Sequence, residues 1–268
     1  MAERKAIFIT GGGSGIGRAV AQKFAANGWF VGLADISTTG MKETAALLPA
    51  GASSQHKLDV RDRAGWDAAL AAFAKAAGGK IDVVFNNAGI PLGGALIDNK
   101  VEEIERCLDI NLKGVLFGAQ ASHAWLKASA PGSCLLNTAS AAGIYGTPGA
   151  SVYSATKFGV RAITESLDGE WAEDGIKVCD LMPGFIDTPL LDHTANQGSN
   201  EHIRGRVQEA GLEITPVTEV AETAWAAVHG NRLHNRVGKT AHRLAFASRW
   251  IPGRLRKQVR STLRPLGQ

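Results

Sequence analysis

The sequence predicts an α/β fold built on a doubly wound parallel sheet of six or seven strands, with helices on both faces. Short aliphatic runs alternate with longer amphipathic runs along the 268 residues, a pattern typical of a βαβ series. A glycine-rich stretch directly follows the first aliphatic run. The hydrophobic content of 45% and the charged content of 20% are ordinary for a globular chain. Together these observations indicate a single-domain Rossmann fold.

The strands are assigned to brief β-branched or aliphatic runs, as expected for strands that are covered on both faces. They are expected near residues 5–10, 30–35, 54–59, 81–86, 133–139 and 176–182. The helices are assigned to the amphipathic stretches near 15–27, 39–48, 62–77, 100–128 and 152–174. Asp62 is a good N-cap for the third of these helices, and Gly78 ends it. No linker or repeat interrupts the series, so residues 1–268 are taken as one domain.

Composition restricts the location and the partners of the chain. It has no secretory leader pattern and no apolar run near the ~18 residues that span a bilayer. Cys107, Cys134 and Cys179 match no metal spacing, so we expect reduced thiols, a cytoplasmic location and no metal site. Residues 223–268 hold ten Lys and Arg and no Asp or Glu, whereas the preceding 222 residues hold 19 basic and 25 acidic groups. No recognition motif accompanies this charge, so no nucleic-acid partner is expected.

The loop between the first strand and the first helix has the chemistry of a phosphate site. Its sequence from residue 10 to 17 is TGGGSGIG. Glycines let the backbone turn tightly and approach a pyrophosphate, whose charge the helix N-terminus favours. The loop residues expected to contact a dinucleotide are Gly11, Ser14, Gly15, Ile16 and Gly17.

The acidic residue that ends the second strand indicates which dinucleotide binds. Asp35 follows Gly17 by 18 residues, where a carboxylate can accept hydrogen bonds from the adenosine ribose hydroxyls of NAD. The same charge repels the 2′-phosphate of NADP, and the next residue, Ile36, offers that phosphate no partner. Arg18 either reaches a phosphate or faces solvent, and the sequence leaves both open. NAD is therefore favoured over NADP.

Tyr153 and Lys157 form a candidate acid–base pair. Residues four apart on a helix project from the same face, so the ammonium is expected near the phenol. A neighbouring positive charge favours the phenolate and lowers the pKa of tyrosine from its usual value of ~10. Ser140, at the end of the fifth strand, can hydrogen-bond a substrate oxygen. A tyrosine whose pKa is lowered in this way can take the proton of an alcohol while hydride leaves for a nicotinamide.

In this combination of motifs the chain resembles the short-chain dehydrogenase/reductase superfamily, over roughly residues 5–230. The shared pattern includes the TGxxxGxG and YxxxK motifs of its NAD-preferring branch. The matching positions are residues 10–17, Asn86-Asn87-Ala88-Gly89, Asn111, Ser140, Tyr153-Ser154-Ala155-Thr156-Lys157 and Pro183-Gly184. The resemblance implies an NAD-dependent alcohol dehydrogenase or ketone reductase.

The resemblance also implies roles for individual residues. Tyr153 would transfer the proton, Ser140 would orient the substrate oxygen, and Lys157 would also bind the nicotinamide ribose. Asn111 would hold a water molecule that links Lys157 to solvent. The remaining implied contacts of the cofactor are Asp59 and Val60 with adenine, Asn87, Ala88 and Gly89 on the adenosine side, and Pro183, Gly184, Ile186 and Thr188 near the carboxamide.

Two segments depart from the regular alternation of strands and helices. Residues 187–215 are polar and irregular, and they are expected to form a substrate lid at the carboxyl edge of the sheet. Residues 244–268 form a basic amphipathic extension, with Leu255, Val259 and Leu263 on one stripe. This stripe packs on the body or on a second subunit, covers a lipophilic substrate entrance, or lies on an anionic membrane. The sequence leaves a homodimer and a homotetramer open.

The residues around the expected site favour a bulky apolar alcohol or ketone as the substrate. They offer apolar surface and little that would bind a charged molecule: Ala141, Ala142, Ile144, Tyr145, Phe185 and Leu190. An alternative function is an NAD-binding regulator or scaffold without turnover. That alternative requires a missing catalytic group, whereas all four implied catalytic residues are present.

Overall fold

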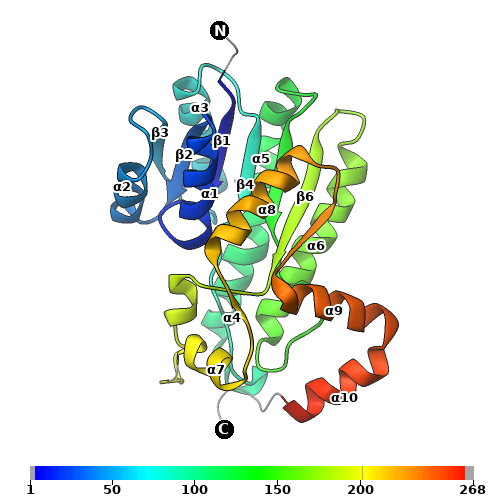
Figure 1. Cartoon of the computed structure of the whole chain (residues 1–268). Coiled ribbons are helices and arrows are strands. Elements are labelled where there is room, and N and C mark those ends of the chain that lie inside the picture. Colours follow the sequence, from blue (N-terminus) through cyan, green and yellow to red (C-terminus); the bar gives the residue numbers. More distant parts are fainter. Residues whose placement is uncertain (1–3, 201, 263–268) are drawn as a thin grey trace.

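The computed structural model describes residues 4–200 and 202–262, and its core is a seven-stranded parallel sheet (Figure 1). The strand order is β3-β2-β1-β4-β5-β6-β9. The strands are β1 (Ala6–Thr10), β2 (Phe30–Asp35), β3 (Ser53–Lys57), β4 (Val83–Asn86), β5 (Cys134–Thr138), β6 (Lys177–Pro183) and β9 (His234–Val237). The predicted Rossmann fold is confirmed, and its main sheet has seven strands, within the six or seven that the sequence predicts.

The strand order reverses at β1, which pairs with β2 on one side and β4 on the other. Ile9 of β1 is aligned with Leu33 of β2 and with Phe85 of β4. The connections that leave β1 and β4 therefore run to opposite faces of the sheet. In doubly wound folds this divergence opens a ligand crevice at the carboxyl ends of the strands.

Ten α-helices are found within the described residues. They are α1 (Gly15–Ala26), α2 (Thr38–Ala46), α3 (Arg63–Ala76), α4 (Val101–Leu108), α5 (Gly114–Ala128), α6 (Ser151–Glu170), α7 (Ile203–Glu209), α8 (Val217–His229), α9 (Gly238–Trp250) and α10 (Pro252–Thr262). The sequence predicts one helix over 100–128, whereas the structure divides it into α4, a π-helical segment η2 (Asp109–Lys113) and α5. No helix in the described part of the chain is both long and apolar enough to cross a bilayer.

Two apolar layers attach the helices to the sheet. On one face, Phe24 of α1 and Val220 of α8 pack with strand residues such as Ile9. On the other face, Trp66 of α3 and Leu126 of α5 belong to a second cluster around Phe8, Val84 and Leu135. All of these side chains are fully buried. The sheet is thus covered on both faces, which explains the continuous apolar runs of its central strands.

Beyond the carboxyl edge of the sheet, in the lower part of Figure 1, lie α7, α9 and α10, whereas α8 covers one face of the sheet and β9 is its last strand. Residues 187–215, expected to be irregular, contain a short 3₁₀ helix η4 (Pro189–Asp192), α7 and β8 (Ile214–Thr215), which pairs with β7 (Phe185–Ile186). The basic extension forms most of α9 and all of α10. Leu255 of its predicted apolar stripe is buried and Val259 is half-buried. Leu263 lies outside the described residues.

Candidate active site

The glycine-rich loop passes from β1 into α1 through positions where side chains do not fit. Gly11 and Gly15 have φ angles of 66° and 49°, in the left-handed region that favours glycine. A Cβ atom on Gly17 would lie 2.1 Å from the carbonyl oxygen of Gly11, so the helix approaches the loop this closely only without a side chain. Ser14 and Ile16 complete the turn, and the first N–H groups of α1 lie at the crevice.

Asp35 holds the loop from the neighbouring strand. Its Oδ2 accepts a hydrogen bond from the backbone N–H of Gly13, and its Oδ1 accepts one from Ser37, both at 2.9 Å. Arg18 donates to the carbonyl oxygen of Gly13 at 2.7 Å and forms an ion pair with Glu43 at 2.8 Å. A carboxylate therefore lies beside the loop, and the nearest cation on α1 already has an acidic partner.

Thr10 joins the carboxyl ends of β1 and β4. Its hydroxyl oxygen accepts hydrogen bonds from the backbone N–H groups of Asn87 at 2.9 Å and Ala88 at 3.1 Å. The Asn87 amide donates to the Thr10 carbonyl oxygen at 2.9 Å and accepts from the Thr138 hydroxyl at 3.2 Å. These bonds fix the segment that the sequence assigns to the adenosine side. Sequence reasoning placed Thr10 in the loop motif but assigned it no such role.

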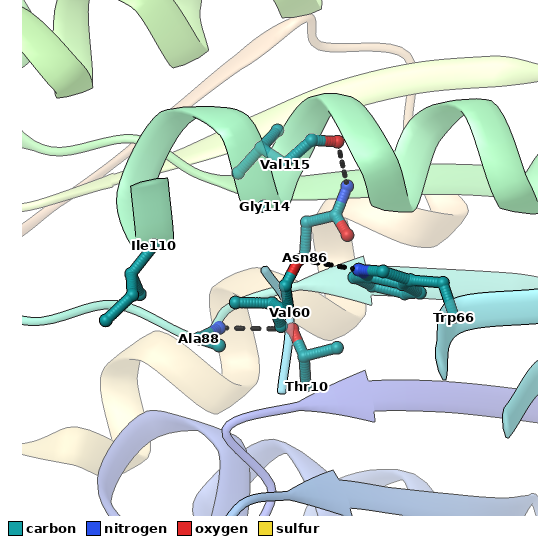
Figure 2. Close-up of a pocket in the computed structure, with 8 residues that line it drawn as sticks. All are labelled: Thr10, Val60, Trp66, Asn86, Ala88, Ile110, Gly114 and Val115. Carbon is teal, nitrogen blue, oxygen red and sulfur yellow. Dashed lines mark hydrogen bonds between the residues drawn. The ribbon is translucent and has the colours of Figure 1, made fainter. Parts of the chain in front are cut away.

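A narrow crevice lies between the end of β4 and the start of α5 (Figure 2). It is lined by Thr10, Val60, Trp66, Asn86, Ala88, Ile110, Gly114 and Val115. Val60 and Ala88 thus lie together, although 28 positions separate them in the chain. The neighbouring Asp59 is paired with Arg61 at 2.6 Å. Thr10, Trp66 and Asn86 are buried here, and the space between the side chains is too small to hold a ring.

Ser140, Tyr153 and Lys157 meet at the carboxyl end of β5. Lys157 is 4% exposed; its Nζ donates to the carbonyl oxygen of Thr138 at 2.7 Å and lies 5.6 Å from the ring centroid of Tyr153. The buried hydroxyl of Ser140 hydrogen-bonds Tyr153 and accepts from the backbone N–H of Ala142 at 3.1 Å. The four-residue spacing on α6 therefore places the ammonium beside the aromatic ring, as the sequence predicts.

The electrostatics of this pair differ from the expectation. Burial raises the pKa of Tyr153 to about 12, while the hydrogen bond with Ser140 acts in the opposite direction. Burial also lowers the pKa of Lys157 to about 8. The prediction that Lys157 lowers the pKa of Tyr153 is thus wrong for the protein by itself. A desolvated site penalises the charge of both groups, and the ammonium is directed at Thr138.

Asn111 lies in the π-helical segment and is fully buried. Its side-chain Oδ1 accepts from the backbone N–H of Ile90 at 2.8 Å, and its Nδ2 donates to the carbonyl oxygen of Ile90 at 2.9 Å. A Cβ atom on Gly89 would lie 3.3 Å from Asn111 Oδ1 and 3.8 Å from Lys157 Nζ, so Gly89 lies beside both side chains. The Asn111 side chain thus holds the chain after β4 beside Lys157. π-Helical turns of this kind are frequent at functional sites.

The end of β6 approaches both Ser140 and the glycine loop. Ser140 donates to the carbonyl oxygen of Pro183 at 3.4 Å. A Cβ atom on Gly15 would lie 3.4 Å from the side chain of Thr188, and the Thr188 hydroxyl donates to the carbonyl oxygen of Ile186 at 3.3 Å. Residues 183–188, which include Gly184, therefore connect the loop to the site around Tyr153.

Arg204 of α7 is a residue that sequence reasoning missed. Its guanidinium pairs with Asp187 at 2.7 Å and Asp192 at 2.6 Å, and it donates to the carbonyl oxygen of Thr188 at 3.3 Å. One side chain thus fixes α7 to the chain that follows β6. The polar segment 187–215 contains several charged residues, and nothing in their order distinguishes this one.

Comparisons with known proteins identify the fold and its relatives. Residues 5–198 match the family described as short chain dehydrogenase. A meso-2,3-butanediol dehydrogenase of Serratia marcescens is 30% identical over 207 residues, 77% of this chain and 79% of that protein. A 3-alpha-(or 20-beta)-hydroxysteroid dehydrogenase of Mycobacterium bovis is 37% identical over 188 residues, 70% of this chain and 71% of that protein.

A solved structure extends the likeness over the whole chain. The crystal structure of a short chain dehydrogenase/reductase from Burkholderia phymatum in complex with NAD superposes with a TM-score of 0.82 at 26% identity. The match covers 100% of both chains. The similarity to that structure therefore includes the region of α9 and α10, beyond the residues that the family match covers.

Proposed function

We propose that this chain, which belongs to the short-chain dehydrogenase family, interconverts a secondary alcohol and a ketone with NAD(H). The relatives named above are oxidoreductases that act on alcohols and ketones. The observation that carries this proposal is the meeting of Ser140, Tyr153 and Lys157 at one strand end, beside the segment 183–188. Ser140 follows β5, Tyr153 and Lys157 lie on the next helix, α6, and the segment 183–188 comes from the end of β6.

The residues present fit a dinucleotide. The close contact of Gly17 with Gly11 leaves only backbone at the loop, where a pyrophosphate would bind. The adenine ring would lie against Val60 and Ala88, which meet near the end of β4. Residues 183–188 would hold the nicotinamide carboxamide, with Thr188 beside the loop. When bound, the nicotinamide supplies or accepts the hydride.

The protein's own contribution is to position a proton. In ketone reduction, Tyr153 donates its phenolic proton to the substrate oxygen; in alcohol oxidation it accepts that proton. The Ser140 hydroxyl lies within reach of Tyr153 and would hold the same oxygen. Lys157 would bind the ribose hydroxyls. Both polar atoms of the Asn111 side chain already hydrogen-bond the backbone of Ile90. A proton relay from Lys157 to solvent would therefore use the main chain of the π-helical segment.

The preference for NAD rests on charge. Asp35 is held at the loop by Gly13 and Ser37, where its carboxylate would accept the ribose hydroxyls of NAD and repel a 2′-phosphate. Arg18, the cation with access to that phosphate, is bound to Glu43. The Burkholderia relative is a complex with NAD, in agreement with this preference.

The substrate class follows from the apolar surroundings of Ser140. Ala141 and Ala142 are buried directly after it, and Phe185 follows the end of β6. Residues 187–215 would cover the substrate as a lid, fixed by Arg204. We therefore propose a bulky apolar alcohol or ketone, and the hydroxysteroid dehydrogenase relative acts on substrates of that kind by its name.

The protein is further proposed to form homo-oligomers. Leu108 of α4, Leu116 of α5 and Phe158 of α6 are large apolar side chains exposed on neighbouring helices. Such exposure on helices of one layer is typical of subunit contacts. Sedimentation velocity of the purified chain distinguishes a monomer, a dimer and a tetramer.

The mechanism is tested by replacing each of the two tyrosines of the chain in turn. Tyr153→Phe removes the phenolic proton, so turnover of a panel of ketones with NADH is expected to fall by about 10²–10⁴-fold. NADH binding, measured by fluorescence, should persist. Tyr145→Phe, the matched control, should keep more than half of the activity. Undiminished turnover by Tyr153→Phe would refute the mechanism, and an inactive wild-type protein that binds NADH would favour a regulator.

A further inference from the structure

The C-terminal arm, defined here as residues 238–262 of α9 and α10, extends beyond the carboxyl edge of the sheet (Figure 1). α9 packs against β9 and β6, and α10 packs against α9. Among residues 238–260, whose burial the structure describes, Ala241 and Leu255 are buried. Leu255, the first residue of the apolar stripe predicted from the sequence, is therefore buried. The exposed face of the arm consists of other residues.

The outward face of α9 combines aromatic and cationic side chains. Lys239, Arg243, Phe246 and Trp250 occupy positions i, i+4, i+7 and i+11, so they share one stripe of the helix. All four are exposed, with Phe246 at 60% and Trp250 at 65%. Ala241 lies on the opposite side and is fully buried. Large aromatic residues with this much exposure indicate a contact surface rather than a solvent-facing one.

The charge of the arm has one sign. Residues 238–262 contain seven Lys and Arg and no Asp or Glu. The guanidinium of Arg249 lies 5.4 Å from the ring of Trp250, so cation and aromatic residue are in direct contact. Lys239 has an acidic neighbour in Glu213, at 3.8 Å, but its own side chain remains 77% exposed. The body that precedes the arm has more acidic than basic residues, so the positive charge is concentrated here.

We propose that the C-terminal arm is a peripheral membrane-binding surface for bilayers that contain anionic lipids. Trp250, whose indole has an apolar body and a polar N–H, would enter the interfacial region, and the apolar ring of Phe246 would enter beside it. Lys239, Arg243 and Arg249 would remain hydrated and contact the headgroup phosphates.

A lipid surface suits this combination better than the same arm of a second copy of the chain. A twofold contact through the arm would bring the same cations of both copies together, and it would remove them from water without acidic partners from either arm. An anionic headgroup layer provides the opposite charge over the whole stripe. The inference does not depend on the proposed reaction, because none of the residues that carry it belongs to the candidate active site.

Vesicle flotation of the full-length protein tests the proposal. We expect binding to phosphatidylcholine vesicles that contain phosphatidylglycerol, weaker binding at high salt, and little binding to phosphatidylcholine alone. Phe246→Ala/Trp250→Ala should weaken binding by at least about tenfold. Lys239→Gln/Arg243→Gln should weaken it by about fivefold for each cation removed. The matched control is Leu47→Ala/Lys42→Gln, an exposed apolar–cation pair of the α2 region, which should bind like the wild type.

Thermal melting and turnover should be unchanged in these variants, because the replaced side chains are exposed and outside the site. Absence of flotation with the anionic vesicles, or equal binding to both vesicle types, would overturn the proposal. The proposal would also be overturned if Phe246→Ala/Trp250→Ala dissociated an oligomer in sedimentation velocity, because the stripe would then be a contact between copies. A failure of either kind leaves NADH-linked turnover unaffected, so it is distinguishable from failure of the proposed reaction.

Discussion

Tyr153 and Lys157 lie in surroundings that disfavour the charge of each. Burial raises the pKa of the phenol to about 12 and lowers that of the ammonium to about 8. Tyr153 is therefore protonated throughout the physiological range, which suits the donation of a proton to a ketone. Lys157 changes charge close to that range, so it is the group expected to give the site a pH dependence.

The rate of ketone reduction should accordingly follow the ionisation of Lys157. Because its pKa in the fold is lowered to about 8, the positive charge is present below that pH and lost above it. We expect kcat/KM to be level below pH 8 and to decline above it. Lys157→Arg, which stays charged, should be slower by about tenfold but should lack that decline. Lys113→Arg, an exposed lysine, is the control, and a wild-type profile that is level to pH 10 would contradict the assignment.

The charge of Asp35 should set the cofactor preference. Asp35→Asn keeps the shape and one acceptor oxygen but removes the negative charge, so kcat/KM with NADPH relative to NADH should rise by about 10–100-fold. Adding Glu43→Gln should raise it further, because Arg18 loses its acidic partner. Steady-state kinetics with both cofactors measure the ratio. Asp62→Asn, an exposed carboxylate at the start of α3, serves as the control, and an unchanged ratio in Asp35→Asn would refute the charge argument.

At the scale of elements, polar contacts join α7 to the chain after β6. Arg204 bridges Asp187 and Asp192, and the main chain of Asp187 pairs with Thr215 of β8 at 2.9 Å. Exposed ion pairs of this kind contribute little to global stability. Their importance here is geometric, because Thr188 lies between them and beside the glycine loop.

Loosening this bridge should weaken binding of the substrate rather than destabilise the fold. Arg204→Gln removes both ion pairs, so KM for the ketone and the dissociation constant of NADH should each rise by about tenfold, with a smaller change in kcat. Arg204→Lys, which retains the charge but not the forked geometry, should be intermediate. Arg232→Gln is the matched control on an exposed arginine before β9. If both constants stayed at their wild-type values, the lid would not depend on Arg204.

At the scale of the whole molecule, a polar network fastens the last strand to the sheet. Asp180 of β6 is fully buried and pairs with His234 of β9 at 3.0 Å. The other ring nitrogen of His234 pairs with Glu165 of α6 at 3.1 Å, and Glu165 pairs with Arg161 at 2.7 Å. The hydrogen bond with Asp180 is the main reason that the pKa of His234 is raised. Burial in turn raises the pKa of Asp180.

Global stability should therefore depend on the protonation of His234. Since its pKa is raised in the fold, the stabilisation is fully present below the unfolded value of ~6.5 and is lost as the pH rises through the folded value. Loss of a charge-assisted hydrogen bond costs about 1.5–3 kcal/mol. His234→Gln should therefore melt roughly 3–10 °C lower at pH 6. At pH 9 it should differ less from the wild type. His242→Gln, at an exposed histidine of α9, is the control, and equal differences at both pH values would exclude this linkage.

The sequence by itself determined the first six strands of the sheet, the alternation of strands with helices up to β6, and the candidate residues of the site. The central strands are short apolar runs that must be covered on both faces, and such a run leaves few alternatives for its secondary structure. The glycine loop and the pair Tyr153 and Lys157 are likewise local, because a turn and one helical turn fix their geometry. These features could be predicted since each depends on residues that are close in the chain.

Only the tertiary structure decided what surrounds those residues. Three features depend on partners from distant segments: the hydrogen bonds of Asn111 with Ile90, the ion pairs of Arg204 with Asp187 and Asp192, and the burial of Leu255. The pKa of Tyr153 depends in the same way on how deeply its phenol is buried. Burial and pairing are properties of the packed molecule, and desolvation outweighs a single neighbouring charge. The sequence thus specified which groups meet, and packing determined their charge state and their orientation.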